Sequence, residues 1–110
     1  MNRLLLSLDA RTDLEEIREY ISIELENPSA AANTIARITK ELRILRSFAQ
    51  AGAPLSSITD IQNEYRYLTV GNYMVFYRVL GADVFIDRIL YGKRNYLRTL
   101  LGDSNEQGGQ

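Results

Sequence analysis

The chain has 110 residues, 45% of them hydrophobic and 25% charged, with a net charge of −1; this is the composition of one folded domain and not of a disordered segment. We expect this domain to span residues 1–102 and residues 103–110 to form a disordered tail. The chain contains neither cysteine nor histidine, which excludes disulfides, thiolate metal sites and catalytic arrangements built on histidine, and we expect no cofactor and no metal.

The charges are distributed unevenly along the chain. Residues 1–64 contain 7 lysine or arginine residues against 10 aspartate or glutamate residues, whereas residues 65–98 contain 6 against 2. The basic part ends in the stretch YGKRNYLRTLL at residues 91–101, which places three cations among aromatic and apolar residues. Such an asymmetry permits an anionic partner, either nucleic acid or an acidic protein segment.

The N-terminal residues predict a short strand from Arg3 to Leu8. Their apolar run begins at Leu4, is interrupted by Ser7, and is too short for a signal sequence or a membrane span. We therefore expect a cytoplasmic protein with no membrane partner.

Two amphipathic helices are predicted next. Thr12 and Glu15 have the spacing of a capping box, and the first helical pattern stops at Asn27-Pro28. The second helix is predicted from a cap at Ser29 to Phe48, with Gly52 placed to end it. The apolar stripes consist of Leu14, Ile17, Ile21 and Leu25 in the first helix and of Ile35, Ile38, Leu42 and Leu45 in the second.

Three β-rich segments follow at residues 64–70, 73–80 and 83–90. The pairs Gly71-Asn72 and Gly81-Ala82 between them are short enough for tight hairpins, so we predict a three-stranded antiparallel meander. The resulting order is β-α-α-β-β-β, with a short helix from Asn95 to Leu101. The fold class is α+β, with a small antiparallel sheet packed against a helical hairpin.

Two-residue turns in both hairpins would fix which side chains share a face of the sheet. A one-residue bulge in either hairpin would exchange these assignments. The face expected under the helices contains Arg66, Leu68, Val70, Tyr73, Val75, Tyr77, Val79, Val84, Ile86, Arg88 and Leu90. The opposite face is too apolar and aromatic for a plain wet surface, and contains Tyr65, Tyr67, Thr69, Met74, Phe76, Arg78, Phe85, Asp87, Ile89 and Tyr91.

The candidate functional residues are the cations and tyrosines of the sheet and of the segment after it. Arginine binds phosphates and carboxylates, and tyrosine stacks on bases or anchors protein interfaces. The structural alternative is that the tyrosines are cross-strand packing partners and the arginines are solvated strand ends. The set consists of Arg66, Arg78, Arg88, Lys93, Arg94 and Arg98 with Tyr65, Tyr67, Tyr73, Tyr77, Tyr91 and Tyr96.

The run RYLTVGNYMVFYRVLGADVFIDRILYGKRNYL at residues 66–97 resembles the C-terminal half of the RelE/ParE superfamily, the toxins of type II toxin-antitoxin modules. The preceding strand and helical hairpin are similar to that superfamily's topology. The resemblance implies a cognate antitoxin whose C-terminal segment wraps the toxin and covers its working surface. On the aromatic face of the sheet, the residues expected to meet the antitoxin are Tyr65, Tyr67, Met74, Phe76, Phe85 and Ile89.

Members of this superfamily differ in their target: RelE-like members cleave mRNA on the ribosome, and ParE-like members inhibit DNA gyrase. Met74 stands where RelE-like enzymes have a sheet arginine, and Leu100 stands where we align their C-terminal tyrosine. These two departures favour a ParE-like gyrase inhibitor. Its expected target-binding residues are Tyr91, Lys93, Arg94, Tyr96 and Arg98.

Two other functions stay open at the level of the sequence. One is ribosome-dependent mRNA cleavage without a metal, for which the resemblance implies that Arg94, Lys93, Arg78 and Arg66 surround the phosphate and Tyr91 or Tyr96 positions a base. The other is a non-toxic interaction domain whose aromatic face binds a partner helix.

Overall fold

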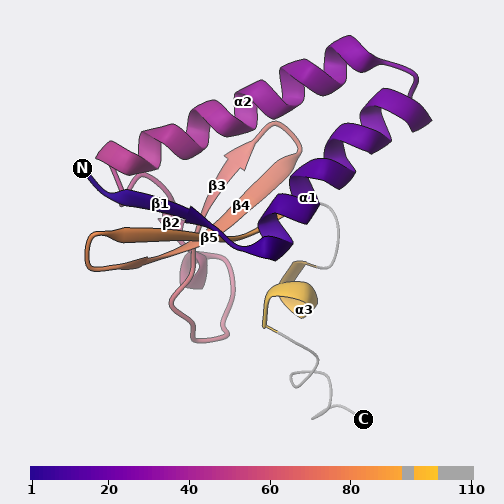
Figure 1. Cartoon of the computed structure of the whole chain (residues 1–110). Coiled ribbons are helices and arrows are strands. Elements are labelled where there is room, and N and C mark those ends of the chain that lie inside the picture. Colours follow the sequence, from indigo (N-terminus) through magenta and orange to yellow (C-terminus); the bar gives the residue numbers. More distant parts are fainter. Residues whose placement is uncertain (93–95, 102–110) are drawn as a thin grey trace, which may run out of the picture.

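The apolar patterns of the sequence fold into a five-stranded sheet with a helical hairpin on one face and a short helix on the other (Figure 1). The structure is a computed structural model that describes residues 1–92 and 96–101. Its helices are α1 (Leu8–Glu19), the π-helical turn η1 (Tyr20–Glu24), α2 (Pro28–Ser47), the 3-10 turn η2 (Leu55–Ser57) and α3 (Tyr96–Leu101). Its strands are β1 (Arg3–Leu6), β2 (Ala53–Pro54), β3 (Arg66–Val70), β4 (Tyr73–Leu80) and β5 (Asp83–Tyr91).

The sheet has the order β1-β5-β4-β3-β2. The predicted meander β3-β4-β5 is confirmed, β1 runs parallel to β5, and β2 adds a short antiparallel edge that the sequence pattern did not predict. Helix α3 agrees with the predicted C-terminal helix, whereas the tail predicted at residues 103–110 lies outside the described residues. No helix within the described ranges is long and apolar enough to cross a membrane.

The starts of both long helices differ from the sequence prediction. Helix α1 begins directly after β1, because the Ser7 hydroxyl accepts a hydrogen bond from the Ala10 amide at 2.9 Å and donates to the Asp87 carbonyl at 2.8 Å. The predicted cap, Thr12, therefore lies inside the helix. Helix α2 is capped by Asn27, which accepts from the Ala30 amide at 3.1 Å, and the prediction of Ser29 as its cap is wrong.

The turn η1 changes the register of the first helix. A π-turn accommodates an extra residue compared with an α-helical turn, so the apolar spacing that holds for Ile17 and Ile21 no longer applies beyond them. Leu25 is 55% exposed, and its assignment to the buried stripe is wrong. In α2 the predicted stripe of Ile38, Leu42 and Leu45 is buried.

The two β-hairpins have the register that their turn residues predict. Gly71 and Gly81 adopt φ angles of 59° and 61°, which L-residues rarely adopt, and Val70 lies opposite Tyr73. One irregularity interrupts the β4-β5 ladder: Phe76 pairs with Arg88 whereas Tyr77 pairs with Ile86, which leaves Asp87 as an extra, bulged residue.

This bulge exchanges the faces at the end of β5. Ile89 lies opposite Val75 and is buried in the core beneath the helical hairpin, so its assignment to the aromatic face is wrong. Leu90 lies opposite Met74 in the core on the other side of the sheet, so its assignment to the helix-covered face is also wrong. Tyr91 shares its face with Tyr73. The physical reason is that one inserted residue reverses the alternation of every side chain that follows it.

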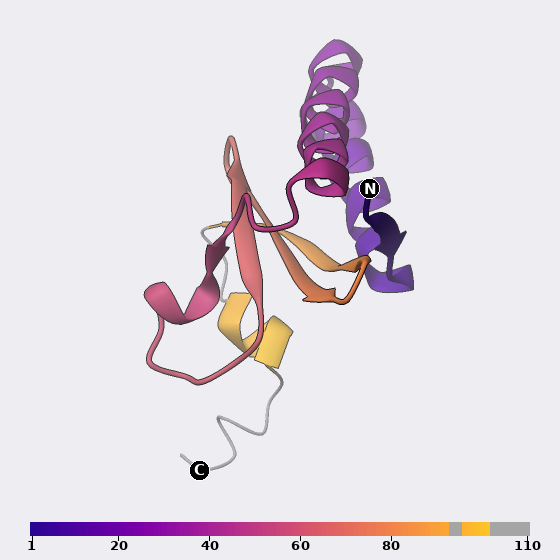
Figure 2. The same cartoon turned by 90° about the vertical axis from the view of Figure 1, so that its left-hand side faces the viewer.

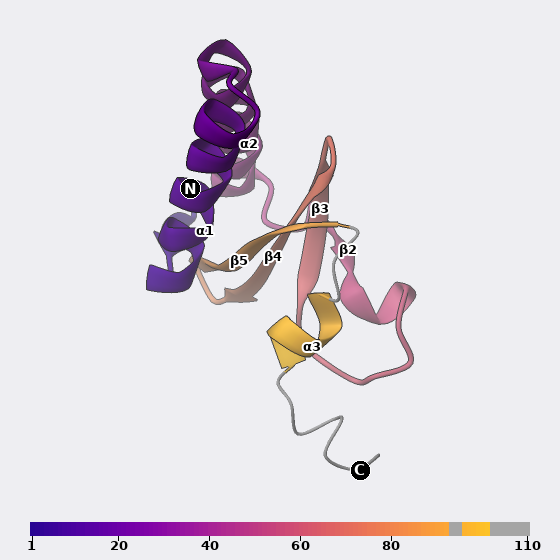
Figure 3. The ribbon, with the colours of Figure 1, turned by 90° about the vertical axis from the view of Figure 1, so that its right-hand side faces the viewer.

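The sheet therefore separates two hydrophobic cores (Figure 2, Figure 3). The larger core fills the space between the sheet and the hairpin α1-α2. The smaller one lies under α3 and the segment after β2, and Tyr96, Leu97 and Leu100 of α3 pack against it. Its buried residues are Leu55, Met74, Phe76 and Leu90.

Gly52 was predicted to end the second helix, but α2 ends at Ser47, with Phe48 as its C-cap. Gly52 is instead buried against the sheet, where its amide donates to the Tyr77 hydroxyl at 2.8 Å, and that hydroxyl donates to the Ala49 carbonyl at 2.9 Å. A Cβ at this position would lie 2.5 Å from the Tyr67 carbonyl oxygen, so only glycine fits without a shift of the backbone.

The helical hairpin is fixed to the sheet by one buried carboxylate. Asp13 of α1 accepts two hydrogen bonds of 2.8 Å from the Arg88 guanidinium and a third of 2.9 Å from the Ile89 amide. It is the only buried charged side chain in the part of the chain that the structure describes. The hydrogen bond to Asp13 raises the pKa of Arg88, so this guanidinium keeps its charge.

We predict that Asp13→Ala lowers the free energy of unfolding by about 3 kcal/mol, because it leaves a partly buried arginine without its carboxylate and a buried amide without an acceptor. Urea denaturation of the purified protein measures the change. Glu16→Ala, which removes an exposed carboxylate from the same helix, is the matched control and should stay within about 0.5 kcal/mol of the parent. Equal effects of the two substitutions would contradict this role of Asp13.

Candidate functional site

The residues predicted to bind a target lie at the end of β5 and in α3. Tyr91 is the last residue of β5 and is exposed, whereas Tyr96 and Arg98 belong to α3. Lys93 and Arg94 lie outside the described residues. Among these residues, Tyr91 is the one on the sheet whose neighbours the structure describes.

Two further tyrosines, Tyr91 and Tyr20, lie in the electrostatic surroundings of Tyr73. The Tyr73 ring meets that of Tyr91 edge-on, with 5.9 Å between the centroids and an interplanar angle of 69°. The pKa of Tyr73 is raised by burial and also by the nearby hydroxyls of Tyr91 and Tyr20. Tyr20 is exposed. We call Tyr20, Tyr73 and Tyr91 the tyrosine patch.

A cation lies at the same end of the sheet. The Arg37 guanidinium of α2 packs over Gly71 in the β3-β4 turn, 3.4 Å from the position a Cβ would take there. Arg37 forms no ion pair within residues 1–92 and 96–101. The Gly92 amide donates to the Asn72 carbonyl at 2.7 Å, so the segment that leads to Lys93 departs from this turn.

Two exposed tyrosines and a half-buried third, beside an arginine with no ion pair in the described part of the chain, suit a protein or nucleic-acid interface. Tyr91 and, as an open case, Tyr73 are candidates in the sequence. Tyr20 and Arg37 are not, because they lie on helices with an ordinary amphipathic pattern and no local motif distinguishes them. Only the packing of the hairpin on the sheet brings them to the end of β5.

The sheet arginines proposed for phosphate binding are both engaged by the fold. Arg66 donates to the Gly52 carbonyl through Nε at 3.1 Å and Nη2 at 2.6 Å, and to the Gln50 carbonyl at 3.3 Å. Arg78 donates to Asp87 at 2.6 and 3.3 Å and lies over the Phe85 ring. A phosphate would have to displace these partners from both arginines.

Tyr65 adjoins the pair of Arg78 and Asp87. Its pKa is raised by burial first, and then by the negative charge of Asp87. The hydroxyl therefore stays protonated at neutral pH and is not poised to accept a proton. Within the described residues, no group of three or more acidic side chains is placed to hold a metal ion.

The face predicted to meet the antitoxin is largely covered by the chain itself. The Tyr96 ring stacks on Phe76 with 5.3 Å between centroids and 28° between planes, and Phe76 is fully buried. Leu100 also packs against this core. Of the residues predicted to face the antitoxin, Met74, Phe76 and Ile89 are buried, whereas Tyr65, Tyr67 and Phe85 are partly exposed. Their role toward an antitoxin stays a prediction.

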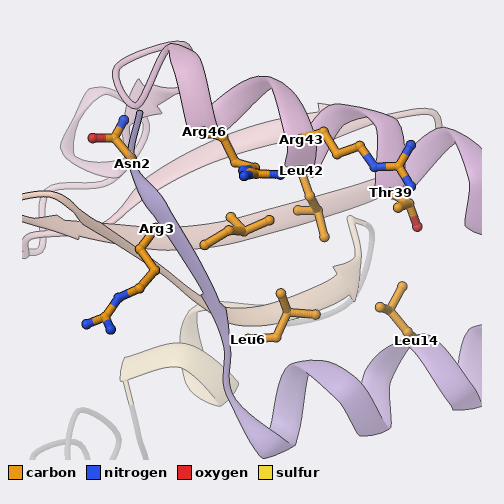
Figure 4. Close-up of a pocket in the computed structure, with 9 residues that line it drawn as sticks. Asn2, Arg3, Leu6, Leu14, Thr39, Leu42, Arg43 and Arg46 are labelled. Atoms are coloured by element: carbon orange, nitrogen blue, oxygen red, sulfur yellow. The ribbon is translucent and has the colours of Figure 1, made fainter.

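A groove opens at the other edge of the molecule, between β1 and the helical hairpin (Figure 4). Its volume is about 440 Å³. Leu6, Leu14 and Leu42 project into it, and Arg43 and Arg46 lie along its α2 side. Leu4, Thr39, Asn2 and Arg3 complete the lining. This groove could not be predicted from the sequence, because its residues come from β1, α1 and α2.

Comparison with known proteins gives a family match and matches to solved structures. Residues 4–96 match the family described as "ParE toxin of type II toxin-antitoxin system, parDE". A solved chain from the "Chromosomal ParDE TA system from P. aeruginosa" is 25% identical in sequence and superposes with a TM-score of 0.69, covering 83% of this chain and 96% of that one. No curated protein sequence matches closely enough to count as a relative.

We predict that Tyr96→Ala releases α3 from the sheet, since a six-residue helix has little stability without its packing. Hydrogen exchange at the Leu100 and Leu101 amides, measured by NMR, should become about 10-fold faster, while exchange in β4 changes little. Thr99→Ala alters an exposed side chain of the same helix and serves as the control. Unchanged exchange in Tyr96→Ala would show that the stack on Phe76 does not hold α3.

Proposed function

The chain belongs to the family of ParE toxins of type II toxin-antitoxin systems, and from this premise we propose that it arrests growth by binding and inhibiting DNA gyrase and is neutralised by a cognate antitoxin. ParE-like members of the wider superfamily act on gyrase, and RelE-like members cleave mRNA. The choice between the two depends on whether the sheet arginines of this chain are free to bind a phosphate.

The observation that carries the proposal is the engagement of Arg66 and Arg78. A metal-independent ribonuclease needs cations that are free to neutralise the charge developing on the scissile phosphate, and needs groups that transfer protons. Here both sheet arginines are bound to carbonyl or carboxylate oxygens of the chain itself. Met74, where RelE-like enzymes have an arginine, is buried and carries no charge. These facts support a toxin that acts by binding.

The tyrosine patch is the surface that best suits such binding. Interface hot spots are enriched in tyrosine and arginine because these side chains provide large contact areas together with hydrogen-bonding groups. Tyr20 and Tyr91 are exposed, and Arg37 adds a cation that forms no ion pair among the described residues. Lys93 and Arg94 follow Tyr91 directly in the sequence, which adds positive charge to the target-binding segment.

We predict that the double variant Tyr20→Ala/Tyr91→Ala raises the concentration needed to inhibit gyrase supercoiling by about 30-fold, corresponding to the loss of two aromatic contacts of about 1 kcal/mol each. Because Tyr20 is 54% and Tyr91 37% exposed and neither belongs to a buried core, the variant should remain folded. Phe48→Ala removes an exposed aromatic ring from the end of α2 and should inhibit as the parent does. Failure of the parent chain to inhibit supercoiling at concentrations that arrest growth would rule out gyrase as the target.

The two alternative functions, a ribonuclease and a non-toxic interaction domain, predict different results when the chain is expressed in cells. Expression of the chain alone should arrest growth, and co-expression of the adjacent reading frame should restore it. Primer extension on translated messages should show no new discrete ends during arrest. New ends that disappear in Arg94→Ala would establish RelE-like cleavage instead. Normal growth on expression of the chain alone would leave the interaction domain as the better explanation.

A further inference from the structure

The Arg37 side chain lies at the end of the sheet where β5 stops, beside the β3-β4 turn. Its terminal nitrogens, Nη1 and Nη2, are both 3.4 Å from the point that a Cβ would occupy on Gly71. Figure 3 shows this turn beside the helical hairpin. Arg37 is exposed, and the ion pairs of residues 1–92 and 96–101 do not include it. A guanidinium that packs on a turn and has no counter-ion is available to an external anion.

The tyrosine patch adjoins the same turn. Tyr73 is the second residue after Gly71, and the centroid of its ring is 5.9 Å from that of Tyr91. Burial, followed by the neighbouring hydroxyls of Tyr91 and Tyr20, raises the pKa of Tyr73. This phenol therefore keeps its proton at neutral pH and can donate a hydrogen bond. An anion bound here would meet one positive charge together with neutral tyrosine donors.

The tip of the helical hairpin next to Tyr20 is acidic and apolar. Its exposed residues are Glu19, Ile23, Glu24, Leu25 and Glu26. Duplex DNA carries one negative charge about every 1.7 Å along its axis, so a phosphate bound at Arg37 would bring further phosphates toward these glutamates. A protein surface instead combines a single carboxylate with apolar side chains, which suits one cation beside tyrosines and exposed aliphatic residues.

We propose that Arg37 recognises an acidic side chain of the protein that this toxin binds: the guanidinium pairs with one carboxylate while the tyrosine patch packs around it. The inference rests on the proposed function in one respect, because it takes the recognised protein to be DNA gyrase. It adds a chemical requirement for the target, namely an aspartate or glutamate that projects from an apolar surface. Aromatic side chains around such an ion pair exclude water, which makes the pair stronger than one on an open surface.

The first test reverses the charge at Arg37. Arg37→Glu should raise the concentration needed to inhibit gyrase supercoiling by about 100-fold, because an attraction becomes a repulsion. Arg37→Lys keeps the charge but loses the paired hydrogen bonds of the guanidinium, and should raise that concentration by about 10-fold.

The matched control is Lys40→Glu. Lys40 is exposed on the same helix, three residues further on, and forms no ion pair in the part of the chain that the structure describes. Its charge reversal should leave inhibition within about 3-fold of the parent. Equal losses in Arg37→Glu and Lys40→Glu would report an effect of net charge alone and would overturn the proposal.

Hydrogen exchange separates recognition by Arg37 from support of the fold. The Gly92 amide donates to the Asn72 carbonyl at 2.7 Å, so its exchange rate reports whether the β3-β4 turn keeps its place against the end of β5. In Arg37→Glu this rate, measured by NMR, should stay within about 3-fold of the parent. Faster exchange would show that Arg37 supports the turn, and would overturn direct recognition.

A peptide titration tests the site without gyrase. A short leucine peptide with one central glutamate and blocked ends should shift the NMR signals of the Arg37 side chain and of the Tyr73 and Tyr91 amides. The same peptide with glutamine in place of glutamate, and a short DNA duplex, should not shift them, and Arg37→Glu should abolish the response. If the parent leaves gyrase unaffected but responds to the glutamate peptide in this way, the proposed function fails and the carboxylate site stands. A response to the duplex alone, an equal response to both peptides, or no response to any of these probes would overturn the proposal.

Discussion

The β-bulge at Asp87 is the constraint on which the rest of the structure depends. Its carbonyl accepts from the Ser7 hydroxyl, which caps α1, and its carboxylate pairs with Arg78 on the sheet. The residues just beyond it, Arg88 and Ile89, both donate to the buried carboxylate of Asp13. One extra residue in β5 therefore sets the position of the first helix, reverses the faces of the strand and places Tyr91 beside Tyr73.

The same interactions support the proposal that this ParE-family chain acts by binding and not by phosphate chemistry. Arg78 stabilises the bulge, and Arg66 holds the segment around Gly52 against β3. Each arginine thereby compensates backbone or carboxylate groups that the fold would otherwise leave without partners. What remains exposed is aromatic and cationic surface at two ends of β5: the tyrosine patch at its C-terminal end and the basic groove beside β1 at its start.

The elements set by local residue patterns could be predicted from the sequence. Gly71 and Gly81 determine the two hairpins, and the spacing of Ile38, Leu42 and Leu45 determines the buried side of α2. Features set by tertiary contacts could not. The bulge has no signature in the run DVFIDRILY, since its stabilising partners Ser7 and Asp13 lie more than 70 residues earlier. For the same reason the faces at Ile89 and Leu90 were assigned incorrectly.

The candidate site also combines residues that a local pattern indicates with residues that only tertiary contacts bring together. Tyr91 could be nominated because it begins a basic, aromatic segment, but Tyr20 and Arg37 come from helices that meet the sheet only in the folded chain. The π-helical turn η1 likewise moved Leu25 into solvent against the helical periodicity. For Arg66 and Arg78, residue type alone suggested phosphate binding, and only their hydrogen bonds reveal a structural role.

The central claim, that Arg78 is structural and the chain acts by binding, is tested most directly by replacing its ion pair. The double variant Arg78→Met/Asp87→Leu substitutes apolar side chains of similar size for the partly buried pair, which proteins often tolerate. The measurement is growth arrest on expression of this variant, with cooperative unfolding of the purified protein as proof of folding. Full growth arrest is the result that this account predicts. Loss of arrest in a folded variant, together with loss of new mRNA ends produced by the parent, would contradict it and assign Arg78 to catalysis.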